Sequence, residues 1–91
     1  MIKSFRSRAL KAFWTNGEAS KIQPTLRGRV MLRLQSLDGA KRPEDMNLPG
    51  FNFHPLRGKP QRYTVHVNGP WCITFGWDGK DATDIDLENY H

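Results

Sequence analysis

The chain has 91 residues, a net charge of +5, and hydrophobic and charged fractions of 37% and 25%, which together are typical of one soluble globular domain spanning residues 1–91. No apolar run approaches the roughly 18 residues of a membrane span, and the first residues lack the apolar core of a signal peptide, so we expect a cytoplasmic protein with no membrane partner. A single cysteine excludes an internal disulfide, and no Cys or His spacing suggests a metal or another cofactor.

A short strand and a helix are predicted for the first seventeen residues. The strand covers residues 2–5. The helix begins at Arg6, and Asn16-Gly17 ends it because glycine readily adopts the left-handed conformation found after helices. One face of this helix is apolar and consists of Leu10, Phe13 and Trp14.

A second helix is predicted from Pro24, a residue favoured in the first helical turn, to Asp38-Gly39. Apolar residues recur at helical spacing and form a stripe of Leu26, Val30, Leu34 and Leu37. The helix also carries Arg27, Arg29 and Arg33, which we expect on its solvent-exposed surface. Residues 40–50 contain two prolines and no periodicity, which predicts a loop with at most one helical turn.

The remainder of the chain predicts an antiparallel meander. Phe51 and Phe53 lead a strand into His54-Pro55-Leu56. Strands follow at residues 62–68 and 71–77, joined by the turn Asn68-Gly69-Pro70. A last strand contains Thr83, Ile85 and Leu87, which we expect to share one face.

Period-two alternation divides these strands into an apolar and a polar face. The apolar face contains Tyr63, Val65, Val67, Trp71, Ile73, Phe75 and Trp77. The polar face contains Arg62, Thr64, His66, Asn68, Cys72, Thr74 and Gly76. The predicted fold class is therefore α+β, with two N-terminal helices packed on the apolar face and the concave polar face left open for a ligand.

The charge is concentrated in the first two thirds of the chain. Residues 1–62 carry thirteen Lys and Arg against four Asp and Glu, a net charge of +9, whereas residues 63–91 have a net charge of −4. A basic body favours a polyanion such as nucleic acid, although solubility alone also explains such charge. Three of the cations, Arg57, Lys59 and Arg62, lie within six residues and predict a phosphate-binding cluster; a solvated loop is the alternative.

Several polar residues are candidates for chemistry. Histidine suits general acid–base catalysis, and His91 continues the phase of Ile85 and Leu87 while Tyr90 points the opposite way. His66 is either a surface histidine or a substrate contact. Cys72 has no base beside it in the sequence and is not expected to be a nucleophile. We interpret the acidic residues Asp84, Asp86 and Glu88 as a solvated strand edge and not as a metal cluster.

In their order and spacing, five stretches resemble the HigB toxins of the RelE/ParE superfamily, the killer proteins of type II toxin–antitoxin modules. They are MIKSF, HPLRG, RYTVHVN, the W-x-I-x-F-x-W strand with its Asp-Gly, and the closing Tyr-His. The resemblance covers nearly the whole chain and implies two helices against an antiparallel sheet. It also implies mRNA cleavage in the ribosomal A site by metal-independent attack of the ribose 2′-OH. The implied partner is a helix-turn-helix antitoxin of the HigA type, through which alone operator DNA would be bound.

The resemblance also assigns roles to individual residues. His91 resembles the family's terminal catalytic histidine and Tyr90 its partner tyrosine. Arg57 falls where the family has a lysine or another polar residue, so the resemblance implies that it is the third catalytic residue and binds phosphate in the same way. The implied RNA- and phosphate-binding residues are Lys59, Arg62, His66 and Asn68. Three positions depart from the pattern, because relatives often have arginine at His66 and Cys72 and an acidic residue at Asn89. We expect Arg62 and His66 to compensate for the missing guanidinium groups.

Two other function classes remain open at this point. One is a non-catalytic inhibitor, either a ParE-like protein that blocks gyrase or a ribosome binder without chemistry. The other is a structural nucleic-acid-binding module, which only the charge supports. The pair Tyr90-His91 favours cleavage, since inhibition of gyrase requires no such pair.

Overall fold

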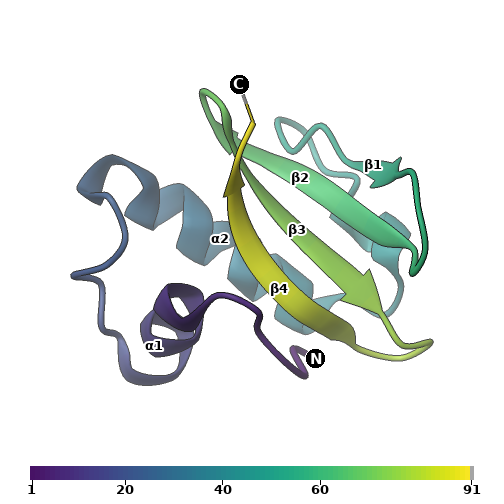
Figure 1. Ribbon diagram of the computed structural model, residues 1–91, viewed down its shortest axis with the longest axis horizontal. Helices are drawn as coiled ribbons and strands as arrows, with labels where there is room; N and C mark the ends of the chain where they lie inside the picture. The colour runs from purple at the N-terminus through teal and green to yellow at the C-terminus, as the bar shows by residue number, and fades with distance from the viewer. Residues whose placement is uncertain (91) are drawn as a thin grey trace.

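The computed structural model describes residues 1–90 and confirms the predicted α+β class. Helices α1 (Arg8–Asn16) and α2 (Arg27–Gly39) precede the strands β1 (His54–Leu56), β2 (Arg62–Asn68), β3 (Trp71–Trp77) and β4 (Ala82–Asn89). The strands form one antiparallel sheet in the order β1-β2-β3-β4. Helix α2 crosses one face of the sheet and α1 packs beside β4, so the opposite face carries no helix (Figure 1).

Both ends of α1 are set by residues adjacent to it. The Ser7 hydroxyl accepts a hydrogen bond from the Leu10 N–H and caps the first turn, so the helix begins at Arg8 and not at Arg6. Gly17 has a φ of 71° and donates its N–H to the last turn of the helix, at Ala12 and Phe13. The predicted stop at Asn16-Gly17 is therefore confirmed.

Helix α2 is preceded by the 3₁₀ turn η1 (Pro24–Leu26), whose first residue is the predicted proline. The apolar stripe is confirmed, because each of its members is at most 2% exposed: Leu26, Val30, Leu34 and Leu37. A second 3₁₀ turn, η2 (Pro43–Met46), is the helical turn expected within residues 40–50. The strand expected from Phe51 begins only at His54, since Asn52 has a left-handed φ of 47° that interrupts the extended backbone.

The prediction that Arg33 lies on the surface is wrong, because its residue is only 6% exposed. Its Nε donates to the His66 carbonyl oxygen at 2.7 Å and its Nη1 to the Arg29 carbonyl oxygen at 3.2 Å. The guanidinium carbon also lies 4.3 Å from the centre of the Phe51 ring. Arg33 therefore joins α2 to β2 from within the molecule, and burial lowers the pKa of its guanidinium.

The N-terminal segment pairs with β4, although it forms two isolated parallel bridges and no continuous strand. The bridges join Ile2 to Ala82 and Phe5 to Ile85. The Lys3 and Arg6 N–H groups donate to the Ala82 and Ile85 carbonyl oxygens, each at 2.8 Å. The segment runs along the first half of β4 (Figure 1) and thereby covers part of the edge of the sheet.

An irregularity in the β2–β3 pairing overturns the predicted position of Asn68. The register shifts between His66 and Asn68, so that Asn68 pairs with Trp71 on the helix-covered face. Arg29 of α2 donates to the Asn68 side-chain oxygen at 3.2 Å. Asn68 therefore lies against α2 and not on the polar face, because one extra residue reverses the alternation.

A second irregularity, in the β3–β4 pairing, places Thr83 on the opposite face from the one predicted. Thr83 pairs with Gly76, after which the register shifts and Asp86 pairs with Thr74. Asp84, with a φ of 48°, lies within this shift. Thr83 is thus on the polar face, where a Cβ on Gly76 would come within 2.8 Å of its hydroxyl, and only Ile85 and Leu87 keep the predicted orientation.

The hydrophobic core fills the space between the sheet and the helices. It contains residues from both helices and from β2, β3 and β4, including Leu10, Phe13, Val65, Val67, Ile73, Phe75 and Ile85. Phe53, Tyr63 and Phe75 continue it as a stack, with ring centres 5.7 and 5.6 Å apart. Full burial of a large apolar side chain contributes about 1.5–3 kcal/mol, so this layer fixes the sheet that carries the polar face.

Candidate functional site on the polar face of the sheet

The register of the strands arranges the side chains of the helix-free face in rows. One row contains His54, Thr64, Thr74 and Asp86. The next contains His66, Cys72 and Glu88, and the row on the other side contains Arg62, Gly76 and Thr83. We call this surface the polar face. Its centre is closed by its own side chains, because Thr64 and Thr74 are buried.

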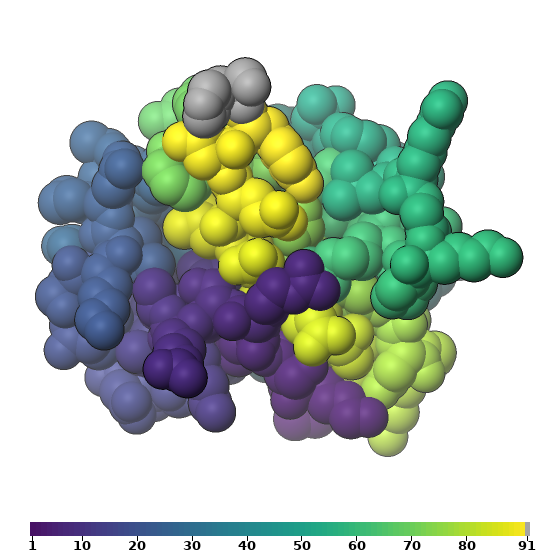
Figure 2. All heavy atoms as spheres, in the orientation of Figure 1, coloured from purple at the N-terminus to yellow at the C-terminus, as the bar shows by residue number. Residues whose placement is uncertain are grey.

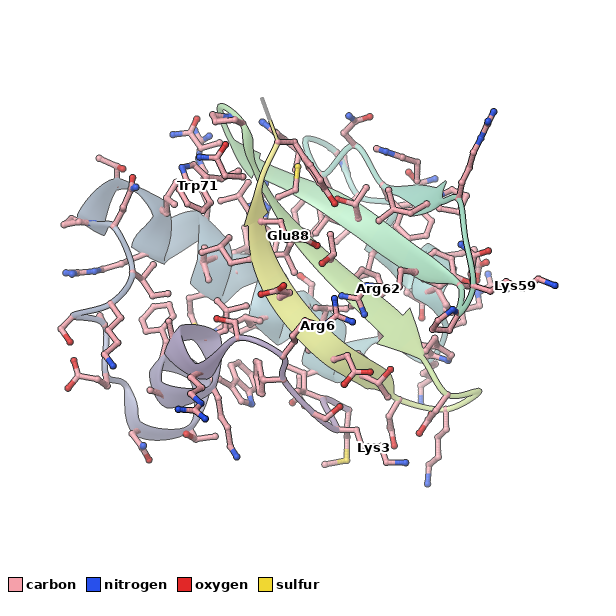
Figure 3. The ribbon with its side chains drawn as sticks, viewed as in Figure 1. Lys3, Arg6, Lys59, Arg62, Trp71 and Glu88 are labelled. Carbon is pink, nitrogen blue, oxygen red and sulfur yellow. The ribbon has the colours of Figure 1, made fainter. Side chains whose placement is uncertain are left out.

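Arg62 lies across the middle of the polar face (Figure 3). Its Nη2 donates to the Thr74 hydroxyl at 3.0 Å and to the Asp84 carbonyl oxygen at 2.9 Å. Burial lowers the pKa of Arg62, and the positive charge of the nearby Arg6 lowers it further. Arg62 therefore remains on the predicted face, but it is held by the protein and does not extend freely into solvent.

Arg6 is a cation of this face that the sequence did not indicate. It is exposed and extends toward Arg62 from the segment that runs beside β4 (Figure 3). Three carboxylates raise the pKa of Arg62 and so oppose the effect of Arg6. They belong to Glu88, Asp84 and Asp86. The acidic residues predicted as a solvated edge thus surround a guanidinium group, and among residues 1–90 no cluster of three or more His, Cys, Asp or Glu has a metal-binding arrangement.

Tyr90 is attached to the sheet beyond the end of β4. Its N–H donates to the Pro70 carbonyl oxygen at 2.7 Å, and its side chain is partly exposed. Burial raises the pKa of the Tyr90 phenol, and the neighbouring Glu88 and Cys72 raise it further. The Glu88 carboxylate and the Cys72 thiol both belong to the polar face, which agrees with the orientation predicted for Tyr90.

Both histidines of the described sheet lie on the polar face. The Nε2 of His66 is 3.0 Å from the Gly69 carbonyl oxygen, and the side chain is half-buried. The Nδ1 of His54 is 3.0 Å from the Asn52 carbonyl oxygen, and His54 is exposed. The sequence did not single out His54, because a three-residue strand is too short for alternation to reveal its face.

The structure does not bring the three predicted phosphate-binding cations together. Arg57 and Lys59 belong to the connection between β1 and β2, are exposed, and within the described part of the chain form neither a hydrogen bond nor an ion pair. Lys59 points away from the sheet while Arg62 lies across it (Figure 3), and side chains of the segment around residue 60 project from the body of the molecule (Figure 2). The two loop cations thus lie outside the cluster formed by Arg62 and Arg6.

The remaining candidates have distinct positions. Cys72 is half-buried on the polar face, between His66 and Glu88 in the register, as the alternation predicts. Asn68 lies against α2, as described above, and Asn89 pairs with Trp71 on the same helix-covered face. His91 is outside the described residues.

No helix within residues 1–90 has the length and apolar character needed to cross a bilayer.

Two residues that the sequence did not indicate as site residues connect the charges of the polar face. The Thr74 hydroxyl accepts the hydrogen bond from Arg62 and donates one to the Glu88 carboxylate. Thr74 was only one polar residue of an alternating strand, and Glu88 was one of several acidic residues at an edge. The register that brings them together is visible only in the folded sheet.

Comparisons with known proteins identify the kind of molecule that carries this face. A family model for the RelE-like toxin of type II toxin–antitoxin system HigB matches residues 3–91. A curated relative from Proteus vulgaris, Endoribonuclease HigB, is 34% identical over 92 residues, and the alignment covers 100% of both proteins.

Proposed function

The chain belongs to the HigB-like family of RelE-like toxins of type II toxin–antitoxin systems, and we propose that it is an endoribonuclease that cleaves mRNA in the ribosomal A site. The observation that carries this proposal is the full-length identity of 34% with a relative named as an endoribonuclease. The polar face supports it, because it combines cations, a carboxylate and a phenol on one surface. Membership of the family implies an antitoxin partner, which we propose to be a HigA-like helix-turn-helix protein.

The proposed reaction is transesterification followed by release of two RNA ends. The 2′-oxygen of one ribose attacks the adjacent phosphorus while the bond from phosphorus to the 5′-oxygen of the next nucleotide breaks. The products are a 2′,3′-cyclic phosphate and a 5′-hydroxyl. One proton leaves the 2′-hydroxyl, one proton reaches the 5′-oxygen, and negative charge accumulates on the phosphate in the transition state. The site therefore has to supply a base, an acid and cations.

Arg62 and Arg6 are the cations that we assign to the scissile phosphate, since they lie together on the polar face. Arg57 and Lys59, on the exposed β1–β2 connection, are proposed to bind RNA phosphates further along the strand. His66 is proposed to contact the substrate from the neighbouring row. Asn68 has no part in this proposal, because its side-chain oxygen is bonded to Arg29 on the other side of the sheet.

We assign the two proton transfers to Tyr90 and His91. The Tyr90 phenol acts near groups of the polar face and carries an O–H proton that it can donate to the leaving oxygen. A histidine titrates near neutrality, so His91 is suited to accepting the 2′-hydroxyl proton. This division of roles is a proposal for the reaction and refines the pair that the resemblance suggested.

Primer extension on mRNA from a translating extract tests the proposed function. We expect new 5′ ends within codons when the protein is added, and we expect them to disappear when initiation is blocked. Equal cleavage of naked RNA would exclude dependence on the ribosome. Intact mRNA together with inhibited gyrase would replace the proposal by the gyrase-inhibitor alternative.

A toxin that occupies the ribosome without cleaving mRNA is the second candidate. It is favoured by His66, Cys72 and Asn89, the three positions that lack the charged residues often found in relatives. Translation arrest with intact mRNA in the same extract would establish this second function. Cleavage at the arrested codon would exclude it.

A further inference from the structure

One buried hydroxyl on the polar face joins a cation to an anion. Thr74 is 0% exposed, and its Oγ1 accepts a hydrogen bond from Arg62 Nη2 at 3.0 Å while donating one to the Glu88 carboxylate. A threonine hydroxyl has one proton to donate and lone pairs to accept. A single hydroxyl thus contacts both the guanidinium and the carboxylate.

Each of these charged groups has a further contact. The Nη2 of Arg62 also donates to the Asp84 carbonyl oxygen at 2.9 Å, so the guanidinium is held from two sides. Glu88 pairs with Cys72 in the register and interacts with the Tyr90 phenol. The hydrogen bonds therefore run from Arg62 through Thr74 to Glu88, across β2, β3 and β4, and the Glu88 carboxylate acts on the pKa of the Tyr90 phenol.

We propose that Thr74 is a positioning residue for RNA cleavage, which holds Arg62 and Glu88 in the relative arrangement that the reaction requires. The proposal rests on the proposed function. In it, Arg62 stabilises the charge on the phosphate, and Glu88 orients the phenol that protonates the leaving oxygen. Thr74 itself is buried beneath these groups and acts only through them.

The neighbouring strand provides a matched comparison. Thr64 is the Cα partner of Thr74 in the register, lies on the same face and is 2% exposed. Its hydroxyl has no hydrogen-bond partner among the described residues. The two threonines share residue type, burial and location, and they differ in whether the hydroxyl bonds charged groups.

The experiment compares Thr74→Val, Thr74→Ser and Thr64→Val in single-turnover cleavage on programmed ribosomes, with thermal melts of each protein. Valine keeps the shape of threonine and removes the hydroxyl, whereas serine keeps the hydroxyl. We expect Thr74→Val to lower the cleavage rate roughly 10–100-fold, because loss of positioning costs up to about 10²-fold. Thr74→Ser should restore most of the rate, and Thr64→Val should leave it unchanged.

A second measurement needs neither ribosome nor RNA. In a Tyr63→Phe background only Tyr90 titrates as a tyrosine, so its ionisation can be followed by ultraviolet absorbance. Thr74→Val should move the pKa of Tyr90 toward the ordinary value of about 10, because the carboxylate is no longer held near the phenol. Thr74→Ser and Thr64→Val should not change it. If Thr74→Val does not fold, Thr74→Ala makes the same test, since it also removes the hydroxyl that holds Glu88.

The outcomes separate this inference from the function on which it rests. An unaltered Tyr90 titration and an unaltered rate in Thr74→Val would overturn the positioning role. An equal loss in Thr64→Val would overturn it as well, because the effect would then belong to packing. Absence of cleavage by the unmodified protein would overturn the proposed function, and the titration would still decide whether the Thr74 hydroxyl holds Glu88.

Discussion

Arg33 is buried without a carboxylate partner among the described residues, and its charge is stabilised by oxygen atoms and a ring. Removing a cation from water is costly unless its N–H groups find acceptors. Here the acceptors are the carbonyl oxygens of His66 and Arg29, and the guanidinium lies over Phe51. The planar fork of arginine fits such a site better than the compact ammonium of lysine.

Replacing Arg33 should therefore destabilise the fold. Arg33→Met keeps apolar packing but removes the donor to the part-buried His66 carbonyl oxygen, which should cost about 1–3 kcal/mol. Arg33→Lys should not restore the loss, because it cannot reproduce both hydrogen bonds. Urea unfolding midpoints measure the effect, with the exposed Arg8→Met as the control. A midpoint for Arg33→Met equal to that of the control would show that the buried contacts contribute nothing.

Cys72 is the second residue whose environment permits a sharp prediction. It lies between His66 and Glu88 in the register and is half-exposed on the polar face. Cys72→Arg should preserve the fold, increase the cleavage rate, and lower the pKa of Tyr90, since a nearby cation favours the phenolate. Cys72→Ala should leave the rate nearly unchanged, because a neutral thiol bonds weakly.

The measurements are single-turnover cleavage, tyrosine titration and thermal melting of the two Cys72 variants. A large loss of stability in Cys72→Arg would contradict the accessible position of this side chain. Abolished cleavage in Cys72→Ala would assign the thiol a role in the reaction that its surroundings do not indicate.

Among the elements, the helices were predicted more accurately than the faces of the strands. The stripe of α2 follows from helical spacing, which tertiary packing does not alter, and Gly17 marks the end of α1 by its own conformational preference. Alternation in a strand, in contrast, holds only while the register is continuous. The shifts beside Asn68 and at Asp84 each add a residue, and each reverses the alternation beyond it.

Only part of the candidate site could be predicted from the sequence, because alternation identifies a face only where the register is continuous. Arg62, His66 and Cys72 lie within the stretch of continuous β2–β3 register, and Tyr90 follows the regular end of β4, so their faces were predicted correctly. The contributions of Arg6 and Glu88 depend on which segments lie next to each other. The parallel pairing of the N-terminal segment with β4 brings Arg6 to the site, and no local pattern encodes a contact between residues about eighty positions apart.

The attachment of the N-terminal segment predicts a specific dependence on pH. Lys3 Nζ lies 2.8 Å from Asp78 Oδ2, and the N–H groups of Lys80 and Asp81 donate to Asp78 Oδ1. The Lys3 hydrogen bond and these N–H groups hold the pKa of Asp78 well below its usual range. A carboxylate whose pKa is lower in the folded state contributes stability above the unfolded pKa of about 3.9, and this contribution is lost as the pH falls through the folded value.

Acidification below about pH 4 should accordingly destabilise the unmodified protein more than Asp78→Asn, which has no charge to lose. Lys3 makes the opposite contribution: its pKa is raised, so its share is complete below about pH 10.5 and is lost as the pH rises through the folded value. Urea unfolding of both proteins at pH 7 and pH 3 measures the difference. An equal loss of stability between pH 7 and pH 3 in the two proteins would show that Asp78 does not cause the pH dependence.

For the molecule as a whole, the uneven charge predicts how the toxin meets its antitoxin. The net charge of +9 on residues 1–62 offers a cationic surface to an acidic partner. Co-expression with a HigA-like helix-turn-helix protein should rescue growth and give one co-eluting complex. Its association rate should fall as salt is raised, because screening weakens long-range attraction. Separate elution at low salt, or an association rate independent of salt, would contradict this prediction.

The pairing of the N-terminal segment with β4 has a consequence for synthesis on the ribosome. Residues 2–5 are translated first but cannot find their partners until residues 82–85 have left the ribosome. This pairing brings Arg6 to Arg62, and Glu88, further along the same strand, accepts the hydrogen bond of Thr74, so a chain without β4 lacks both contacts. The polar face is consequently completed last, only when β4 has joined the sheet.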